Sequence, residues 1–266
     1  MFSVVIPLYN KENEVKRTLE SVLNQTFKDF EVVIVNDGSK DKSVEVVESF
    51  KDPRIRIITQ ENAGVSAARN RGIQETNNEW IAFLDADDLW KENHLQVLNQ
   101  LINQYNEKVF CTSFIRSNQC MDSIKKDNSV DIISDYFSKV VKSGHFFWTS
   151  VTCIHKDVFK QIGLFKEFLS RGEDLDLWAR IGAKFSIIKS NLITAIYVQE
   201  AENKLSITKT NINKSIVNYI DFTKTMSITE KQYYKWLVRN RIKRAIKESD
   251  YKLVLQLIRK YKLNVI

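Results

Sequence analysis

Glycine, proline and cysteine are scarce in this sequence. Its 266 residues include only 7 Gly and 2 Pro, which excludes an extended flexible linker, a collagen-like segment or a low-complexity region. The 3 cysteines, Cys111, Cys120 and Cys153, are odd in number and form no Cys-x-x-Cys pair. This spacing argues against both a disulfide framework and a zinc site, so we expect reduced thiols in an ordinary globular chain.

Long apolar runs are also missing. No window reaches the roughly 18 apolar residues that a membrane span requires, and the run at 2–8 is too short for a signal-peptide core. We therefore expect the chain to remain in the cytoplasm. The formal net charge is +7, and much of the excess lies at 231–262, where 11 Lys or Arg stand against Glu248 and Asp250. Something anionic is expected near this end of the sequence.

The first hundred residues alternate between apolar strands and amphipathic helices. Strands are predicted at 2–7, 31–35, 54–59 and 80–84, and helices at 12–25, 41–50 and 65–76. This alternation predicts an α/β fold, with a mainly parallel central sheet flanked by helices. We divide the chain into a catalytic domain at 1–210, with halves at 1–99 and 100–210, and a C-terminal helical extension at 211–266.

Three carboxylates, Asp85, Asp87 and Asp88, follow the predicted strand at 80–84. In an open α/β sheet, ligands bind at the carboxyl ends of the strands. Like charges this close repel unless a cation compensates them, and Mg²⁺ or Mn²⁺ shared with substrate phosphates is a usual compensation. From these residues alone, Asp87 and Asp88 could instead cap a helix that begins near Leu89.

Two other strand ends carry candidate ligand contacts. Asp37 could accept the imino N–H of uracil or thymine, and Tyr9 offers an aromatic face for stacking on that base. The Asp37 segment also fits a simple turn and helix cap. Arg69 follows small residues at a helix start and suits a phosphate or a base carbonyl, although a surface arginine on an ordinary helix fits equally well.

Five motifs, in this order, resemble those of the family 2 glycosyltransferases, which have the GT-A fold. They lie at Ser3–Asn10, Val35–Ser39, Asn62–Asn70, Phe83–Asp88 and Gly172–Trp178. The resemblance covers residues 2 to about 206. It implies an inverting enzyme that moves a sugar from a nucleotide diphosphate sugar, most simply a UDP-sugar, to a saccharide or lipid-linked acceptor. It also suggests a place in bacterial surface-polysaccharide assembly.

The resemblance also implies roles for individual residues. The donor would be held by Pro7, Tyr9, Asp37, Arg69, Asp85 and Asp87. Pro7, Tyr9 and Asp37 would hold the base, Asp85 would approach the ribose, and Asp87 would bind Mg²⁺ or Mn²⁺ on the pyrophosphate. Such a cation is a Lewis acid placed where negative charge develops on the departing phosphate.

On the acceptor side, Glu173 and Asp174 resemble the catalytic pair of the family. Asp174 would be the general base for the acceptor hydroxyl, and a base opposite the leaving group inverts the anomeric carbon. Without the other motifs, an acidic helix N-terminus is the simpler interpretation of these two residues. Weak acceptor contacts are implied for Trp148 and Thr149, although the aromatic cluster that contains Trp148 also fits an ordinary packed core.

One stretch departs from the family pattern. Where many relatives carry Tyr-Arg-x-His, residues 197–200 are Tyr-Val-Gln-Glu. Glu200 could replace a histidine near the metal, although a surface carboxylate is the simpler interpretation. Two other protein classes compete with the resemblance. A nucleotidyltransferase needs a glycine-rich basic loop that residues 8–11 do not provide. A basic nucleic-acid-binding protein fits the pI of about 9.1 but leaves the aspartates without a purpose.

We therefore expect no nucleic-acid partner. The basic C-terminal helices, with Arg241, Lys243 and Arg244, are expected either to contact an anionic membrane surface or to pack on the catalytic domain. The sequence gives no indication of oligomeric state.

Overall fold

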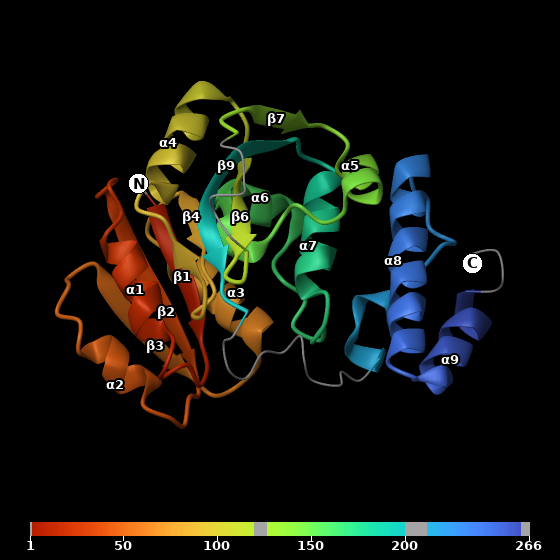
Figure 1. Ribbon diagram of the computed structural model, residues 1–266, viewed down its shortest axis with the longest axis horizontal. Coiled ribbons are helices and arrows are strands. Elements are labelled where there is room, and N and C mark those ends of the chain that lie inside the picture. The colour runs from red at the N-terminus through yellow and green to blue at the C-terminus, as the bar shows by residue number, and fades with distance from the viewer. Residues whose placement is uncertain (1, 120–126, 200–211, 262–266) are drawn as a thin grey trace.

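A mixed sheet with helices on both faces forms the centre of the molecule (Figure 1). The computed structural model describes residues 2–119, 127–199 and 212–261. Within them the nine-stranded sheet has the order β3-β2-β1-β4-β8-β6-β9-β5, and β7 pairs with β9. The first four strands are parallel: β1 (Phe2–Leu8), β2 (Phe30–Asp37), β3 (Ile55–Gln60) and β4 (Trp80–Phe83).

The second half of the sheet mixes directions. It contains β5 (Leu89–Trp90), β6 (Val109–Arg116), β7 (Val130–Ile133), β8 (Thr152–His155) and β9 (Ile187–Tyr197). β8 runs antiparallel to β4 and β6, β9 runs parallel to β6, and β5 and β7 run antiparallel to β9. The predicted α/β fold with a central sheet flanked by helices is confirmed.

Helices connect and cover the strands. They are α1 (Val15–Leu23), α2 (Ser43–Glu48), α3 (Val65–Glu75), α4 (His94–Gln104), α5 (Tyr136–Ser143), α6 (Lys156–Ile162), α7 (Glu173–Gly182), α8 (Ile228–Lys247) and α9 (Tyr251–Tyr261). Right-handed crossovers put α1 and α2 on one face and α3 on the other. Gly72 explains how closely α3 approaches the sheet, because a side-chain carbon there would overlap Cγ1 of Val5.

Continuous apolar runs form the central strands because both of their faces are covered. Val4, Val5, Ile6, Val32 and Ile34 are fully buried. Polar residues appear where these strands end. Since β1, β2 and β4 are parallel, the loops that follow them meet at one edge of the sheet.

Helix α8 packs against α5 at the far end of the sheet (Figure 1). The ring of Tyr233 lies 5.6 Å from that of Tyr136 and 5.3 Å from that of Phe137. Ile246 is 49% exposed, because the buried face of α8 consists of Tyr233, Leu237, Val238, Ile242 and Ala245. Within the described residues, no helix combines the length and the apolar character needed to cross a membrane.

Candidate active site

The loops after β1, β2 and β4 are tied to one another by side chains. The backbone N–H of Asn10 donates to Oγ of Ser39 at 3.1 Å, and the N–H of Lys40 donates to Oδ1 of Asn10 at 2.8 Å. The ammonium of Lys11 lies 3.0 Å from Oδ2 of Asp87. The strand ends predicted to carry function are therefore brought together, and Lys11 joins them as a cation that the sequence analysis missed.

Asp37 is buried and holds the next loop along the sheet edge. Its Oδ1 accepts hydrogen bonds from N of Ala63 at 2.9 Å and from Nε2 of Gln60 at 2.8 Å, while Oδ2 accepts one from N of Gly64 at 2.8 Å. Gly64, with φ of +94°, turns the chain into α3, a conformation that favours glycine. The structure thus gives Asp37 a loop-holding role beside its predicted role in base recognition.

Two other residues expected at the base lie at the end of β1. Pro7 stands opposite Val35 of β2, in register with the strand that carries Asp37. Tyr9 is 44% exposed, which leaves its ring accessible for stacking. Contact of these side chains with a base stays a prediction.

Arg69 connects the loop after β4 to the start of α7. Its guanidinium donates from Nη2 to Oδ1 of Asp85 at 2.7 Å and from Nη1 to Oε1 of Glu173 at 3.2 Å. The side chain is 5% exposed and lies over the ring of Phe165. Burial by itself would lower the pKa of Arg69, but Asp85 and Glu173 raise it above its ordinary value, so the side chain stays charged.

The bridge made by Arg69 was not predicted. From the sequence we expected Arg69 near the base or the phosphates, and the structure places it between two carboxylates from distant segments. Its Nε is buried without a hydrogen-bond partner among the described residues.

Glu173 and Asp174 begin α7 directly after Gly172, whose φ is +75°. Burial and the neighbouring Asp174 raise the pKa of Glu173 to about 7, against the lowering effect of Arg69. Burial also raises the pKa of Asp174, although its Oδ1 accepts a hydrogen bond from N of Leu175 at 2.7 Å. Both carboxylates hold a proton more readily than a free carboxyl group, which suits a general base that works near neutral pH.

The three carboxylates after β4 have different surroundings. Asp88 is buried, and it accepts hydrogen bonds from Oγ of Ser150 at 2.6 Å and from N of Val198 at 3.2 Å. Burial, Asp85 and Asp87 raise the pKa of Asp88 well above its ordinary value. Asp85 and Asp87 are both partly exposed at the sheet edge. The alternative of a helix cap is wrong, because β5 follows these residues.

The carboxylate oxygens of Asp85 and Asp87 are suitable ligands for a hard divalent cation. No three His, Cys, Asp or Glu side chains form a metal-binding group in the ranges 2–119, 127–199 and 212–261. Mg²⁺ often takes only one or two protein carboxylates and completes its shell with water and substrate phosphates, so two partly exposed carboxylates are sufficient. A cation at Asp87 would share that carboxylate with Lys11. Glu200, the candidate substitute for a metal-side histidine, lies outside the described residues.

The segment expected to contact an acceptor lies close to Asp85. The ring of Trp148 packs 4.9 Å from Phe114 and 4.4 Å from Tyr197, and Thr149 is buried. The next residue, Ser150, accepts a hydrogen bond from N of Asp85 at 3.2 Å. The acceptor role of Trp148 and Thr149 stays a prediction.

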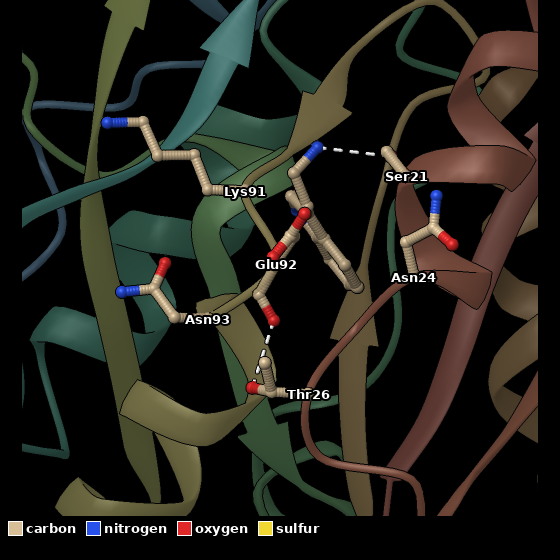
Figure 2. A pocket seen from close by; sticks show the side chains of 7 residues that line it. Ser21, Asn24, Thr26, Lys91, Glu92 and Asn93 are labelled. Atoms are coloured by element: carbon tan, nitrogen blue, oxygen red, sulfur yellow. Dashed lines mark hydrogen bonds between the residues drawn. The ribbon is translucent and has the colours of Figure 1, made fainter.

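A separate polar pocket of about 540 Å³ lies where α1 ends (Figure 2). Its lining is Ser21, Asn24, Thr26, Trp90, Lys91, Glu92 and Asn93. Figure 2 shows the hydrogen bonds from N of Trp90 to Ser21 and from Oγ1 of Thr26 to the carbonyl of Glu92. Because α1 starts at the edge that carries Lys11 and Asp87 and runs back along the sheet, this pocket lies at the opposite edge, away from the site.

Comparison with known proteins gives consistent matches. The family model described as Glycosyl transferase family 2 matches residues 3–163, which include the motifs up to Asp88 but end before Gly172. An uncharacterized glycosyltransferase of Rickettsia bellii (strain RML369-C) is 34% identical over 183 residues, which are 68% of this chain and 26% of that protein. Glycosyltransferase GlyA of Streptococcus pneumoniae serotype 4 is 38% identical over 119 residues, or 44% of this chain and 17% of that protein.

Solved structures share the fold. S. aureus TarS 1-349, crystallised in complex with UDP-GlcNAc, matches with a TM-score of 0.67 and 21% sequence identity. The match covers 79% of this chain and 61% of that one. The chain spans about a quarter or less of the length of the Rickettsia and Streptococcus relatives.

Proposed function

Because the chain belongs to the family 2 glycosyltransferases, we propose that it transfers a sugar from a nucleotide diphosphate sugar to a saccharide or lipid-linked acceptor. The observation that carries the proposal is the bridge from Asp85 through Arg69 to Glu173, with distances of 2.7 and 3.2 Å. One buried side chain thereby links a carboxylate at the end of β4 to the candidate catalytic pair. A UDP-sugar is the donor we propose, supported by the UDP-GlcNAc complex of a protein with the same fold.

The donor would lie across the ends of β1, β2 and β4. Tyr9 would stack on the base, with Pro7 and Asp37 beside it, while Asp85 would face the ribose. Asp87 would hold Mg²⁺ or Mn²⁺, which, when bound, supplies a Lewis acid for the charge on the departing pyrophosphate. Lys11, 3.0 Å from Asp87, offers a second positive charge at the same place.

Asp174 is the general base in this proposal. It would take the proton of the acceptor hydroxyl as that oxygen forms its bond to the anomeric carbon and the bond to the diphosphate breaks. Attack opposite the leaving group inverts the anomeric carbon. The raised pKa of Asp174, caused by burial, supports this role because it makes the carboxylate a stronger base.

A nucleotide titration tests the donor site. UDP, TDP and GDP are titrated into the wild-type chain with Mn²⁺ or with EDTA, by calorimetry. We expect one nucleotide to bind only with Mn²⁺ and the Asp87→Ala variant to lose this binding. Asp29→Ala is the matched control, because Asp29 is exposed at the opposite edge of the sheet. Equal binding in EDTA would refute the metal-bridged site, and no binding of any nucleotide would refute the donor assignment.

The setting that we propose is bacterial surface-polysaccharide assembly at the cytoplasmic face of the membrane. The resemblance and the bacterial sources of the similar proteins support it. The outer face of the C-terminal helices offers a membrane contact, because Lys243 and Lys247 of α8 are exposed beside Ile246. Tyr251 and Leu255 of α9 are also exposed. Exposed apolar and basic side chains on these two neighbouring helices are suited to an anionic lipid bilayer.

Vesicle sedimentation tests the membrane contact. Each basic residue near an anionic surface contributes about 1 kcal/mol, so the Lys243→Glu, Lys247→Glu double variant should bind anionic vesicles much more weakly than the wild type. Lys16→Glu on the exposed side of α1 is the control. Equal sedimentation with neutral and anionic vesicles, or none with either at low salt, would refute the contact.

A further inference from the structure

Arg171, Arg241 and Arg244 lie close enough together for their charges to interact. Arg241 and Arg244 on α8 both donate to Glu248, at 3.2 Å from Nη1 and 2.8 Å from Nε respectively. Two guanidinium groups therefore share one carboxylate and lie side by side. Arg171 approaches them from the loop that precedes Glu173.

The chain around residues 214–216 brings Arg171 to this place. N of Arg171 donates to the carbonyl of Lys214 at 3.3 Å, and N of Ile216 donates to the carbonyl of Arg171 at 3.0 Å. The short helix η4 (Ile216–Asn218) that follows contacts both α7 and α8. In Figure 1 the start of α7, this segment and the end of α8 lie on the same side of the molecule.

Close packing of Gly172 against Ile216 sets the distance between the loop that contains Arg171 and residues 214–216. A side-chain carbon at Gly172 would lie 2.5 Å from Cγ2 of Ile216. Burial and the charges of Arg244 and Arg241 lower the pKa of Arg171, which means that the three cations are close enough to repel one another. Arg241 is only 14% exposed, so part of this positive charge is shielded from bulk water.

Positive charge held together in this way is suited to an anionic ligand. Guanidinium groups match the oxygens of a phosphate with paired hydrogen bonds, and several together bind it more tightly than exposed lysines do. Arg171 comes two residues before Glu173 in the chain, whereas Asp85 and Asp87 follow β4. A phosphate bound there would therefore lie beside the candidate base, not in the place proposed for the donor pyrophosphate.

We propose that Arg171, Arg241 and Arg244 bind a phosphate group carried by the acceptor. The acceptor would then be a phosphorylated saccharide, a lipid-linked phosphate or a phosphodiester polymer, with a hydroxyl near the phosphate presented to Asp174. Identification of the ligand as the acceptor rests on the proposed function. Binding of phosphate by the three arginines does not depend on the proposed function.

Phosphate binding is measured by thermal unfolding of the full chain, with inorganic phosphate in EDTA at constant ionic strength. Without metal, the carboxylates of the donor site repel phosphate, so a saturable rise in Tm reports the arginine cluster. We expect Arg171→Gln, Arg241→Gln and Arg244→Gln each to weaken the apparent affinity about tenfold or more, as expected for the loss of a charged hydrogen-bond donor. Arg259→Gln, an exposed arginine on α9, should change it less than about twofold.

Arg244→Gln is the decisive variant if Arg241→Gln fails to fold, because the Arg244 side chain is 52% exposed. Arg241→Lys should retain more phosphate affinity than Arg241→Gln. Absence of a saturable effect in the wild type, or equal weakening by Arg259→Gln and Arg244→Gln, would overturn the site.

Two further ligands distinguish the sources of the phosphate. Octyl phosphate represents a lipid-linked monoester, and diglyceryl phosphate represents a polymer diester; tighter binding of either one supports the site and identifies the class. The UDP titration with Mn²⁺ is the independent check. UDP binding without phosphate binding overturns this inference alone, whereas phosphate binding without nucleotide binding overturns the assignment of the ligand as an acceptor.

Discussion

Replacement of Arg69 by methionine removes the cation that Asp85 and Glu173 share. Methionine keeps much of the length and apolar contact of the arginine stem, including packing near Phe165. Both carboxylates then lose a partner at 2.7 and 3.2 Å in a largely buried place. Loss of one partner from a buried ion pair costs about 3–5 kcal/mol, because the other charge is left uncompensated.

The loss should depend on pH because of Glu173. Its pKa is raised to about 7, so at about pH 5.5 it is mostly protonated and needs little compensation, whereas at about pH 8 it is ionised. Without Arg69 the pKa of Glu173 should rise further, and each unit of that rise adds about 1.4 kcal/mol to the loss at the higher pH. Arg69→Met should therefore destabilise the protein more at about pH 8 than at about pH 5.5.

Thermal and urea unfolding at the two pH values measure this difference. A loss of about 3–5 kcal/mol corresponds to a fall in Tm of about 6–20 °C for a domain of this size. Arg71→Met is the matched control on α3, since Arg71 is 50% exposed and pairs with Glu75 at 2.8 Å. Such a surface pair contributes about 0–1 kcal/mol. The reasoning would be refuted if Arg69→Met lowered the free energy of unfolding by no more than Arg71→Met does. It would also be refuted if the decrease were the same at both pH values.

Three other predictions follow from the site and the sheet. Asp174→Asn should lower sugar transfer, measured as UDP release, by about 10²–10⁴ because it removes the base, and near-normal turnover would move that role to Glu173. Because the pKa of Glu173 is raised from 4.5 to about 7 in the folded chain, its contribution to stability is full below pH 4.5 and lost as the pH rises through about 7. Urea midpoints should show this loss in the wild type and not in Glu173→Gln. Gly72→Ala should lower the urea midpoint by the equivalent of about 1–3 kcal/mol, because the methyl group would overlap Val5, and an unchanged midpoint would contradict the close packing.

The sequence predicted the parallel half of the sheet well because its signals are local. Apolar runs such as 31–35 and the alternation of strands and helices lie within a few residues of the observed bounds of β1 to β4. Parallel pairing then requires the loops after these strands to meet. Asp37 and Asp87 were predicted at the same edge for that reason, and the structure places both there.

Contacts between segments far apart in the chain could not be predicted from such local signals. Arg69 and Glu173 are 104 residues apart, and their contact depends on where α7 crosses the sheet edge. Asp85, Asp87 and Asp88 have the same chemistry in the sequence, and burial alone separates Asp88 from the other two. Lys11 could have been predicted from its position just after β1, at the edge where a positive charge near Asp87 was expected.

The contact between α5 and α8 links the helix that carries Arg241 and Arg244 to the interior of the molecule. The rings of Tyr136 and Phe137 on α5 pack against that of Tyr233 on α8. Substitutions in one helix therefore require compensating substitutions in the other. A chimera that takes its C-terminal helices from a different family member would need a matching α5, or aromatic rings would be left facing water. Two of the three arginines that we assign to the acceptor, Arg241 and Arg244, lie on the same helix as Tyr233. Under this assignment, the core constrains divergence of acceptor choice, and the architecture favours inheritance of α5 and α8 as a pair.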